Sequence, residues 1–92
     1  MKNEKLSFGQ ALEKLKEGKK LSRKGWNGKG MFIYYVPQGN YPPTTNPEQE
    51  IINEDGLVPY QEYIAFKTRE STVVPWVASQ TDILSNDWVV VE

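Results

Sequence analysis

The N-terminal part of the chain has the spacing of an amphipathic helix. Apolar side chains recur at the i, i+3, i+4 and i+7 positions that share one helical face: Phe8, Ala11, Leu12 and Leu15. Ser7 and Gln10 stand three residues apart, as in a capping box, and Gly18 suits the position just after a helix C-terminus. The pattern predicts a helix that begins near Phe8 and ends before Gly18.

The rest of the chain has the composition of strands separated by turns. Runs rich in β-branched and aromatic residues occupy residues 19–23, 31–36, 63–68, 72–76 and 88–91. The run at 31–36 is continuously apolar, which indicates a central strand, and the short connection 69–71 predicts an antiparallel hairpin. Pro75 places the end of the second strand of that hairpin at an edge or where pairing stops. We therefore predict an α+β fold, with an N-terminal helix packed on a four- to five-stranded antiparallel sheet.

The middle of the chain predicts little regular structure. Residues 37–40 have turn composition, and residues 41–60 contain four prolines among many polar residues. A loop of this length in a small domain typically covers a site or a subunit interface. Disorder is the alternative, although Tyr41 and Tyr60 offer apolar surface that could anchor the segment.

Composition narrows the function classes. The 92 residues suit a single domain, and the chain contains neither cysteine nor histidine, which weighs against an enzyme, a disulfide scaffold and a metal site. A net charge of −1 argues against binding to DNA or RNA polymers, and the apolar runs are too short to cross a membrane. Residues 1–6 lack the apolar core of a signal peptide, so we expect a cytosolic protein.

Charge is segregated along the chain. Basic residues crowd one segment: Lys19, Lys20, Arg23, Lys24 and Lys29. Acidic residues dominate the part between Lys29 and Lys67: Glu48, Glu50, Glu54, Asp55 and Glu62. Such segregation suits subunits that meet basic face to acidic face, and two solvated loops would give the same pattern.

Two stretches carry candidate binding residues. The first, residues 23–31, combines three glycines with Arg23, Lys24 and Trp26, which suits recognition of an anion and an aromatic ring. The alternative is a glycine-rich strand connection with a half-buried tryptophan. The second stretch places a polar cluster just after Trp76: Ser79, Gln80, Thr81 and Asp82. Helix capping by Ser79 or Asp82 is the alternative for this cluster.

Several blocks of sequence together resemble the second Thoeris anti-defence family of small phage proteins. They are residues 7–12, 24–31, 35–37, 55–56, 63–65 and 74–82, followed by Asp87-Trp88. The blocks Trp-Asn-Gly-Lys-Gly and Pro-Trp-Val-Ala-Ser-Gln-Thr-Asp are unusual, and the resemblance covers nearly the whole chain apart from the proline-rich middle.

The resemblance implies a sponge, which binds and holds the cyclic ADP-ribose signal of bacterial Thoeris immunity without degrading it. It also implies a homotetramer with ligand pockets between subunits, and in some members a second site for cyclic oligonucleotides. From the small domain, the long aromatic loop and the segregated charge we predict a tetramer built as two dimers. Such a protein acts in the cytoplasm of the infected bacterial host and needs no cofactor.

The residue chemistry suits that role. Phe8, Trp26 and Trp76 could stack on adenine or close the pocket, while Trp88 belongs in the core. Hydrogen bonds to the ligand are expected from a polar set: Asn27, Ser79, Gln80, Thr81 and Asp82. Arg23, Lys24 and N–H groups of the glycine loop, including Gly28, are candidates for the pyrophosphate.

Two other function classes compete with the sponge. A nucleotide-signal hydrolase would need a carboxylate cluster, and Asp82 and Asp87 are the only close aspartates. A non-catalytic adaptor would use the same tryptophans and prolines at a protein interface.

Overall fold

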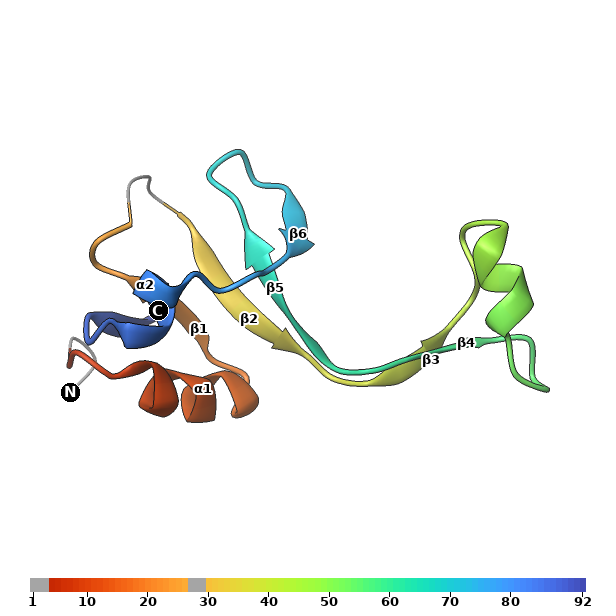
Figure 1. Ribbon diagram of the computed structural model, residues 1–92, viewed down its shortest axis with the longest axis horizontal. Helices are drawn as coiled ribbons and strands as arrows, with labels where there is room; N and C mark the ends of the chain where they lie inside the picture. The colour runs from red at the N-terminus through yellow and green to blue at the C-terminus, as the bar shows by residue number, and fades with distance from the viewer. Residues whose placement is uncertain (1–3, 27–29) are drawn as a thin grey trace.

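The structure is a computed structural model that describes residues 4–26 and 30–92. It consists of a body and a long protruding arm (Figure 1). The elements in chain order are α1 (Phe8–Lys16), β1 (Lys20–Arg23), β2 (Phe32–Val36), β3 (Gly39–Tyr41), the 3-10 helix η1 (Pro47–Ile51), β4 (Val58–Tyr60), β5 (Tyr63–Lys67), β6 (Val73–Pro75), α2 (Gln80–Leu84) and β7 (Trp88–Val91).

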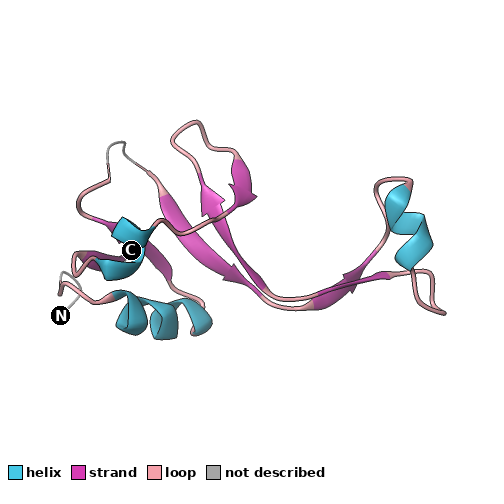
Figure 2. Ribbon diagram, in the orientation of Figure 1, coloured by secondary structure: helices cyan, strands magenta, loops and turns pink. Residues whose placement is uncertain are grey.

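The body contains a five-stranded sheet in the order β6-β5-β2-β1-β7, with antiparallel pairing throughout (Figure 2). Strand β2 is central, β5 and β6 form the predicted hairpin, and Pro75 lies on an edge strand, where a missing N–H costs no ladder bond. Helix α1 packs against β1, β2 and β7. The predicted α+β class and the helix on an antiparallel sheet are therefore confirmed.

Local sequence explains both ends of α1. The Ser7 hydroxyl oxygen accepts a hydrogen bond from the Gln10 backbone N–H at 3.2 Å, and the Ser7 N–H donates to the Gln10 side chain at 2.9 Å. Gly18 follows the helix with a φ of 93°, a conformation that other residues adopt only with strain. The predicted capping box and glycine stop are confirmed.

The core lies between α1 and the sheet. Its buried residues are Leu6, Ala11, Leu15, Leu21, Ile33 and Trp88. Trp88 is fully buried, as predicted, and its indole N–H donates to the carbonyl oxygen of Asp82 at 2.9 Å. The hydrogen bond satisfies the one polar atom of the ring, so that the large apolar surface can be buried without an unpaired donor.

The arm is a continuation of the two central strands. Strand β2 leads into β3, and β4 leads back into β5, so that β3 and β4 form a two-stranded ribbon with η1 beyond it (Figure 1). The turn predicted at residues 37–40 is therefore wrong in its second half: Gly39 and Asn40 lie in β3, opposite Tyr60 and Pro59. The partner strand lies about twenty residues further on, so local composition gave no sign of the pairing.

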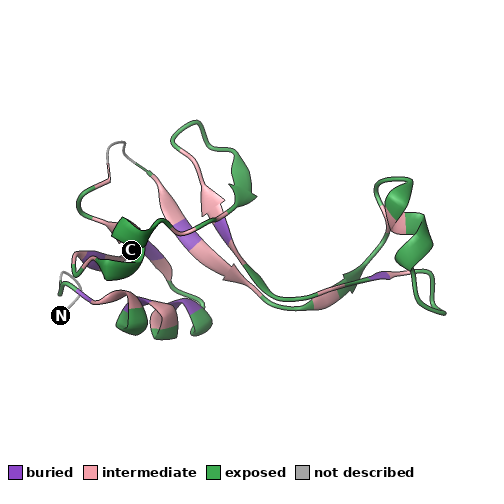
Figure 3. Cartoon of the chain, in the orientation of Figure 1, coloured by how far each residue is buried: buried purple, intermediate pink, exposed green. Residues whose placement is uncertain are grey.

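The far end of the arm is held by one carboxylate. Glu48 accepts hydrogen bonds from the Thr44 N–H at 2.7 Å, the Thr44 hydroxyl at 3.0 Å and the Thr45 N–H at 3.1 Å, and also from the Tyr60 hydroxyl. The Tyr60 hydroxyl, followed by the Thr44 N–H, lowers the pKa of Glu48 to about 2. Val58 alone is buried among the described arm residues, and the surface beyond it is exposed (Figure 3).

The first prediction concerns the buried tryptophan. Trp88→Ala should lower the free energy of unfolding by about 3–5 kcal/mol, because the substitution leaves a cavity under α1 and an unpaired Asp82 carbonyl. Urea denaturation at pH 7 measures the change. Val77→Ala is the control, since Val77 is 87% exposed and its truncation should change stability by less than about 0.5 kcal/mol. Equal stability of the two variants would contradict the central place of Trp88.

Candidate ligand-binding site

Three predicted site aromatics converge on the buried tryptophan. The Trp26 and Trp76 rings meet Trp88 nearly edge-on, with centroids 5.3 and 5.9 Å away, and Phe8 lies 5.7 Å from Trp88 and 5.9 Å from Trp76. Trp26 also meets Phe66 edge-on at 5.5 Å. The three outer rings are half-buried, so each combines packing against the core with an edge or face open to a ligand. We call Phe8, Trp26, Trp76 and Trp88 the aromatic cluster.

An arginine between two carboxylates lies beside the aromatic cluster. Arg23 donates from Nη1 to Asp82 at 2.9 Å and from Nε to Asp87 at 2.9 Å. Its side chain is only 14% exposed, and those of Asp82 and Asp87 are 13% and 26% exposed. Asp87 also accepts a hydrogen bond from the Gly25 N–H at 2.9 Å, so the loop after β1 is fixed to the segment before β7.

Asp82 connects this ion pair to the aromatic cluster. The carboxylate oxygen that binds Arg23 also accepts the indole N–H of Trp26 at 3.2 Å, and its other oxygen accepts the Ser79 N–H at 3.2 Å. The Ser79 hydroxyl in return accepts the Asp82 N–H at 3.0 Å, which completes a capping box at the start of α2. Helix capping, the alternative for Ser79 and Asp82, is therefore what the structure shows.

The charges of this network reinforce one another. The hydrogen bonds that Arg23 donates to Asp87, and then to Asp82, raise the pKa of Arg23, and the same bond to Asp87 lowers the pKa of that carboxyl. For Asp82, burial acts to raise the pKa, but the combined hydrogen bonds from Arg23, Ser79 and Trp26 outweigh it and lower the pKa. All three groups are therefore charged at neutral pH.

The remaining predicted residues are more accessible. Ser79, Gln80 and Thr81 are exposed at the start of α2, and Lys24 is exposed directly after β1. The structure thus brings the aromatic and polar candidates to one end of the body, where α1, α2 and the loop after β1 meet (Figure 1). Asn27 and Gly28 lie outside the described residues.

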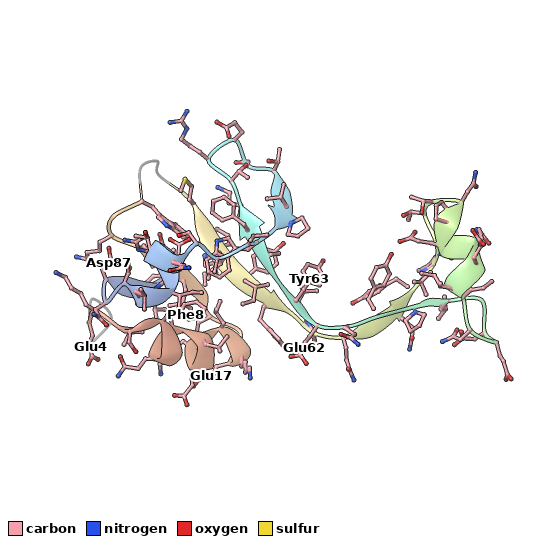
Figure 4. The ribbon with its side chains drawn as sticks, viewed as in Figure 1. Glu4, Phe8, Glu17, Glu62, Tyr63 and Asp87 are labelled. Carbon is pink, nitrogen blue, oxygen red and sulfur yellow. The ribbon has the colours of Figure 1, made fainter. Side chains whose placement is uncertain are left out.

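Asp87 belongs to this site, although the sequence suggested it only as one of the two aspartates that a hydrolase would need. It lies near the start of α1, in the region where Figure 4 also labels Phe8. Its partner Arg23 is 64 residues away in sequence, and the only available signal was its position just before an apolar closing strand. The pairing of β1 with β7, Arg23 opposite Trp88, brings the two side chains together.

The carboxylates of the described site residues are engaged in structural contacts. Among residues 4–26 and 30–92, no group of three or more carboxylates could hold a metal ion. Asp82 and Asp87, the pair considered for a hydrolase, both bind the Arg23 guanidinium. Within the same residues, no helix has the length and hydropathy needed to cross a bilayer.

The second prediction concerns the pH dependence of the Arg23 network. Because the folded pKa values of Asp82 and Asp87 lie below the unfolded value near 3.9, their stabilisation is full above roughly pH 5 and is lost as the pH falls below 4. Asp87→Asn should therefore lower stability by about 1–3 kcal/mol at pH 7 and by much less at pH 3. Glu13→Gln on the exposed side of α1 is the control and should lower stability little at either pH. Urea titrations at the two pH values measure both, and a pH-independent deficit for Asp87→Asn would contradict this account.

Comparison with known proteins agrees with the sequence resemblance. Residues 6–91 match the Thoeris anti-defense 2-like domain. The chain is also 40% identical over 88 residues to a protein of Bacillus phage SP01 named Thoeris anti-defense 2, and the alignment covers 95% of this chain and 96% of that protein. The matched residues include every helix and strand of the body and of the arm. The chain belongs to the Thoeris anti-defense 2-like family.

Proposed function

We propose that this protein is a phage anti-defence sponge, which binds a cyclic ADP-ribose isomer made by bacterial Thoeris immunity and holds it without cleaving it. Family membership supports the anti-defence role. The observation that carries the choice of ligand is the convergence of half-buried aromatic rings and exposed polar side chains at one end of the body. A sponge of this kind starves the immune effector of its signal in the cytoplasm of the infected host.

The aromatic cluster suits the adenine of such a ligand. Phe8, Trp26 and Trp76 are each fixed against Trp88, so their open faces are preorganised and little side-chain entropy is lost on stacking. The exposed side chains of Ser79, Gln80 and Thr81, together with Asn27, supply hydrogen bonds for ribose hydroxyls and the base edge.

The two basic candidates have different roles in this proposal. Lys24 is exposed and free to approach the pyrophosphate, with N–H groups of the glycine loop, including Gly28, as additional donors. Arg23 is already bound by two carboxylates, so we assign it chiefly to holding Asp82, and through it the indole of Trp26, in place. Its charge still contributes to the field at the site.

The available chemistry supports binding without cleavage. The sequence contains no histidine or cysteine, and the two carboxylates of the described site, Asp82 and Asp87, have lowered pKa values and bind Arg23. A carboxylate of low basicity is a poor general base at neutral pH. The site therefore suits binding better than hydrolysis.

Assembly completes the proposal. We expect a homo-oligomer, a tetramer built as two dimers, with each ligand pocket formed where two subunits meet. Cyclic oligonucleotides at a second site belong to the same proposal. Light scattering at micromolar protein should give a mass well above the 10.6 kDa of one chain.

The third prediction tests the aromatic contacts. Trp26→Ala and Trp76→Ala should each weaken binding of a cyclic ADP-ribose isomer by about 1–3 kcal/mol, roughly tenfold to a hundredfold, because each loses a stacked ring. Calorimetric titration measures the affinity, and thermal melts confirm that each variant is folded. Leu84→Ala in α2, at an apolar side chain that is 74% exposed, is the control and should bind as the parent does. Parent-like binding by both tryptophan variants would place the pocket elsewhere.

The fourth prediction separates a sponge from a hydrolase and from an adaptor. Ligand incubated with excess protein and released by heat should be recovered unchanged, because the site lacks a suitable base. Chromatography of the released material measures this. Linear ADP-ribose or AMP that accumulates with time and protein would identify an enzyme, and failure of every tested cyclic nucleotide to bind would favour an adaptor.

A further inference from the structure

Among the described residues, α1 packs on one face of the body sheet and no layer covers the other face. Leu21 and Ile33, directly opposite each other in β1 and β2, point toward α1 and are fully buried. Their neighbours along the strands therefore point to the other face, which we call the open face. It carries a row of aromatic and aliphatic side chains: Phe32, Tyr34, Val36, Tyr63 and Val73.

The open face continues into a groove at the root of the arm. The groove has a volume of about 650 Å³ and is lined mostly by apolar side chains from β2, β6 and both strands of the arm, including Tyr41, Pro42, Tyr60 and Val74. Tyr63, which Figure 4 labels at the root of the arm, lies in it and is 45% exposed. No residue of the aromatic cluster lines this groove, so it is separate from the candidate ligand site.

The other end of the open face is basic. Lys20 and Lys67 place their ammonium groups 5.2 and 5.7 Å from the centre of the Phe32 ring, and Lys67 also donates to the Gly30 carbonyl oxygen at 2.8 Å. Val73 lines both this basic hollow and the arm groove, so the two are parts of one surface.

The arm has the opposite charge and little support from its own body. Residues 37–62, which connect β2 to β5 and form the arm, contain five carboxylates and no basic residue. Near the tip, Ile51 and Ile52 are 59% and 39% exposed, and Glu50 and Glu54 are exposed beside them. The principal contacts of β3, β4 and η1 are with one another (Figure 1). An apolar and acidic projection of this kind matches the apolar and basic open face in both respects.

We propose that the arm of one protein chain docks on the open face of a second copy, with its acidic tip near Lys20 and Lys67 and its apolar side chains against the arm groove. Two copies can exchange arms reciprocally about a two-fold axis, so each contact occurs twice. The proposal rests on the homo-oligomer proposed above and names the surfaces that form it. It also explains why the arm carries exposed apolar side chains although it has no hydrophobic core of its own, since docking would bury them.

Paired charge reversals test the contact. Glu50→Lys/Glu54→Lys reverses the tip, and Lys20→Glu/Lys67→Glu reverses the open face, while Glu48 is kept because it holds the arm together. Light scattering and sedimentation at physiological salt measure the protein concentration at which each oligomer dissociates. This concentration should be at least tenfold higher for each double variant than for the parent. An equimolar mixture of the two should reassemble, because the reversed charges are again complementary.

The control for charge change alone is Lys5→Glu/Lys16→Glu, two exposed lysines outside the open face, which should assemble like the parent. Thermal melts exclude unfolding. Parent-like assembly of both test variants, failure of the mixture to reassemble, or equal dissociation of the control would overturn the arm contact. A monomeric parent would overturn the homo-oligomer as well, whereas loss of the ligand-sponge role would appear separately, in the parent's nucleotide titration.

Discussion

The guanidinium of Arg23 is the contact on which the functional end of the body depends. Its two carboxylate partners come from the start of α2 and from the residue before β7, segments that share no local sequence with β1. Half-buried charges of this kind are stable only when every partner is present, because removal of one leaves another desolvated and unpaired. The network therefore fixes one position of α2 relative to the residues that follow β1. Apolar packing alone would allow several such positions.

The same network explains how large rings can be both part of the core and part of a surface. Trp26 and Trp76 rest on the fully buried Trp88, and Asp82 receives the indole N–H of Trp26 while its carbonyl receives that of Trp88. Rings held on one side by packing and by a directed hydrogen bond have few conformations left to lose. A binding surface built in this way is already ordered before a ligand arrives.

Local patterns in the sequence predicted the local parts of the structure. Helical spacing, a capping box and a glycine predicted α1. The apolar composition of the last strand predicted the burial of Trp88. Two features were not predicted, because each depends on residues far apart in the sequence. They are the ribbon that places Gly39 opposite Tyr60 and the pairing of Arg23 with Asp87. Turn composition and an isolated aspartate carry no information about a distant partner. The ligand contacts, the oligomer and the absence of cleavage remain predictions.

The position of β7 in the sheet has a consequence for synthesis of the protein. It is the last strand in the sequence and lies beside β1, the first, and Leu6 forms a bridge with Trp88. Neither the core ring nor the carboxylate partners of Arg23 exist until residues 82–88 have left the ribosome. Before β7 is available, a nascent chain that has emerged leaves the apolar face of α1 and one edge of β1 without their partners. The body therefore closes only when β7 pairs with β1, and α1 gains its full set of contacts in the same step.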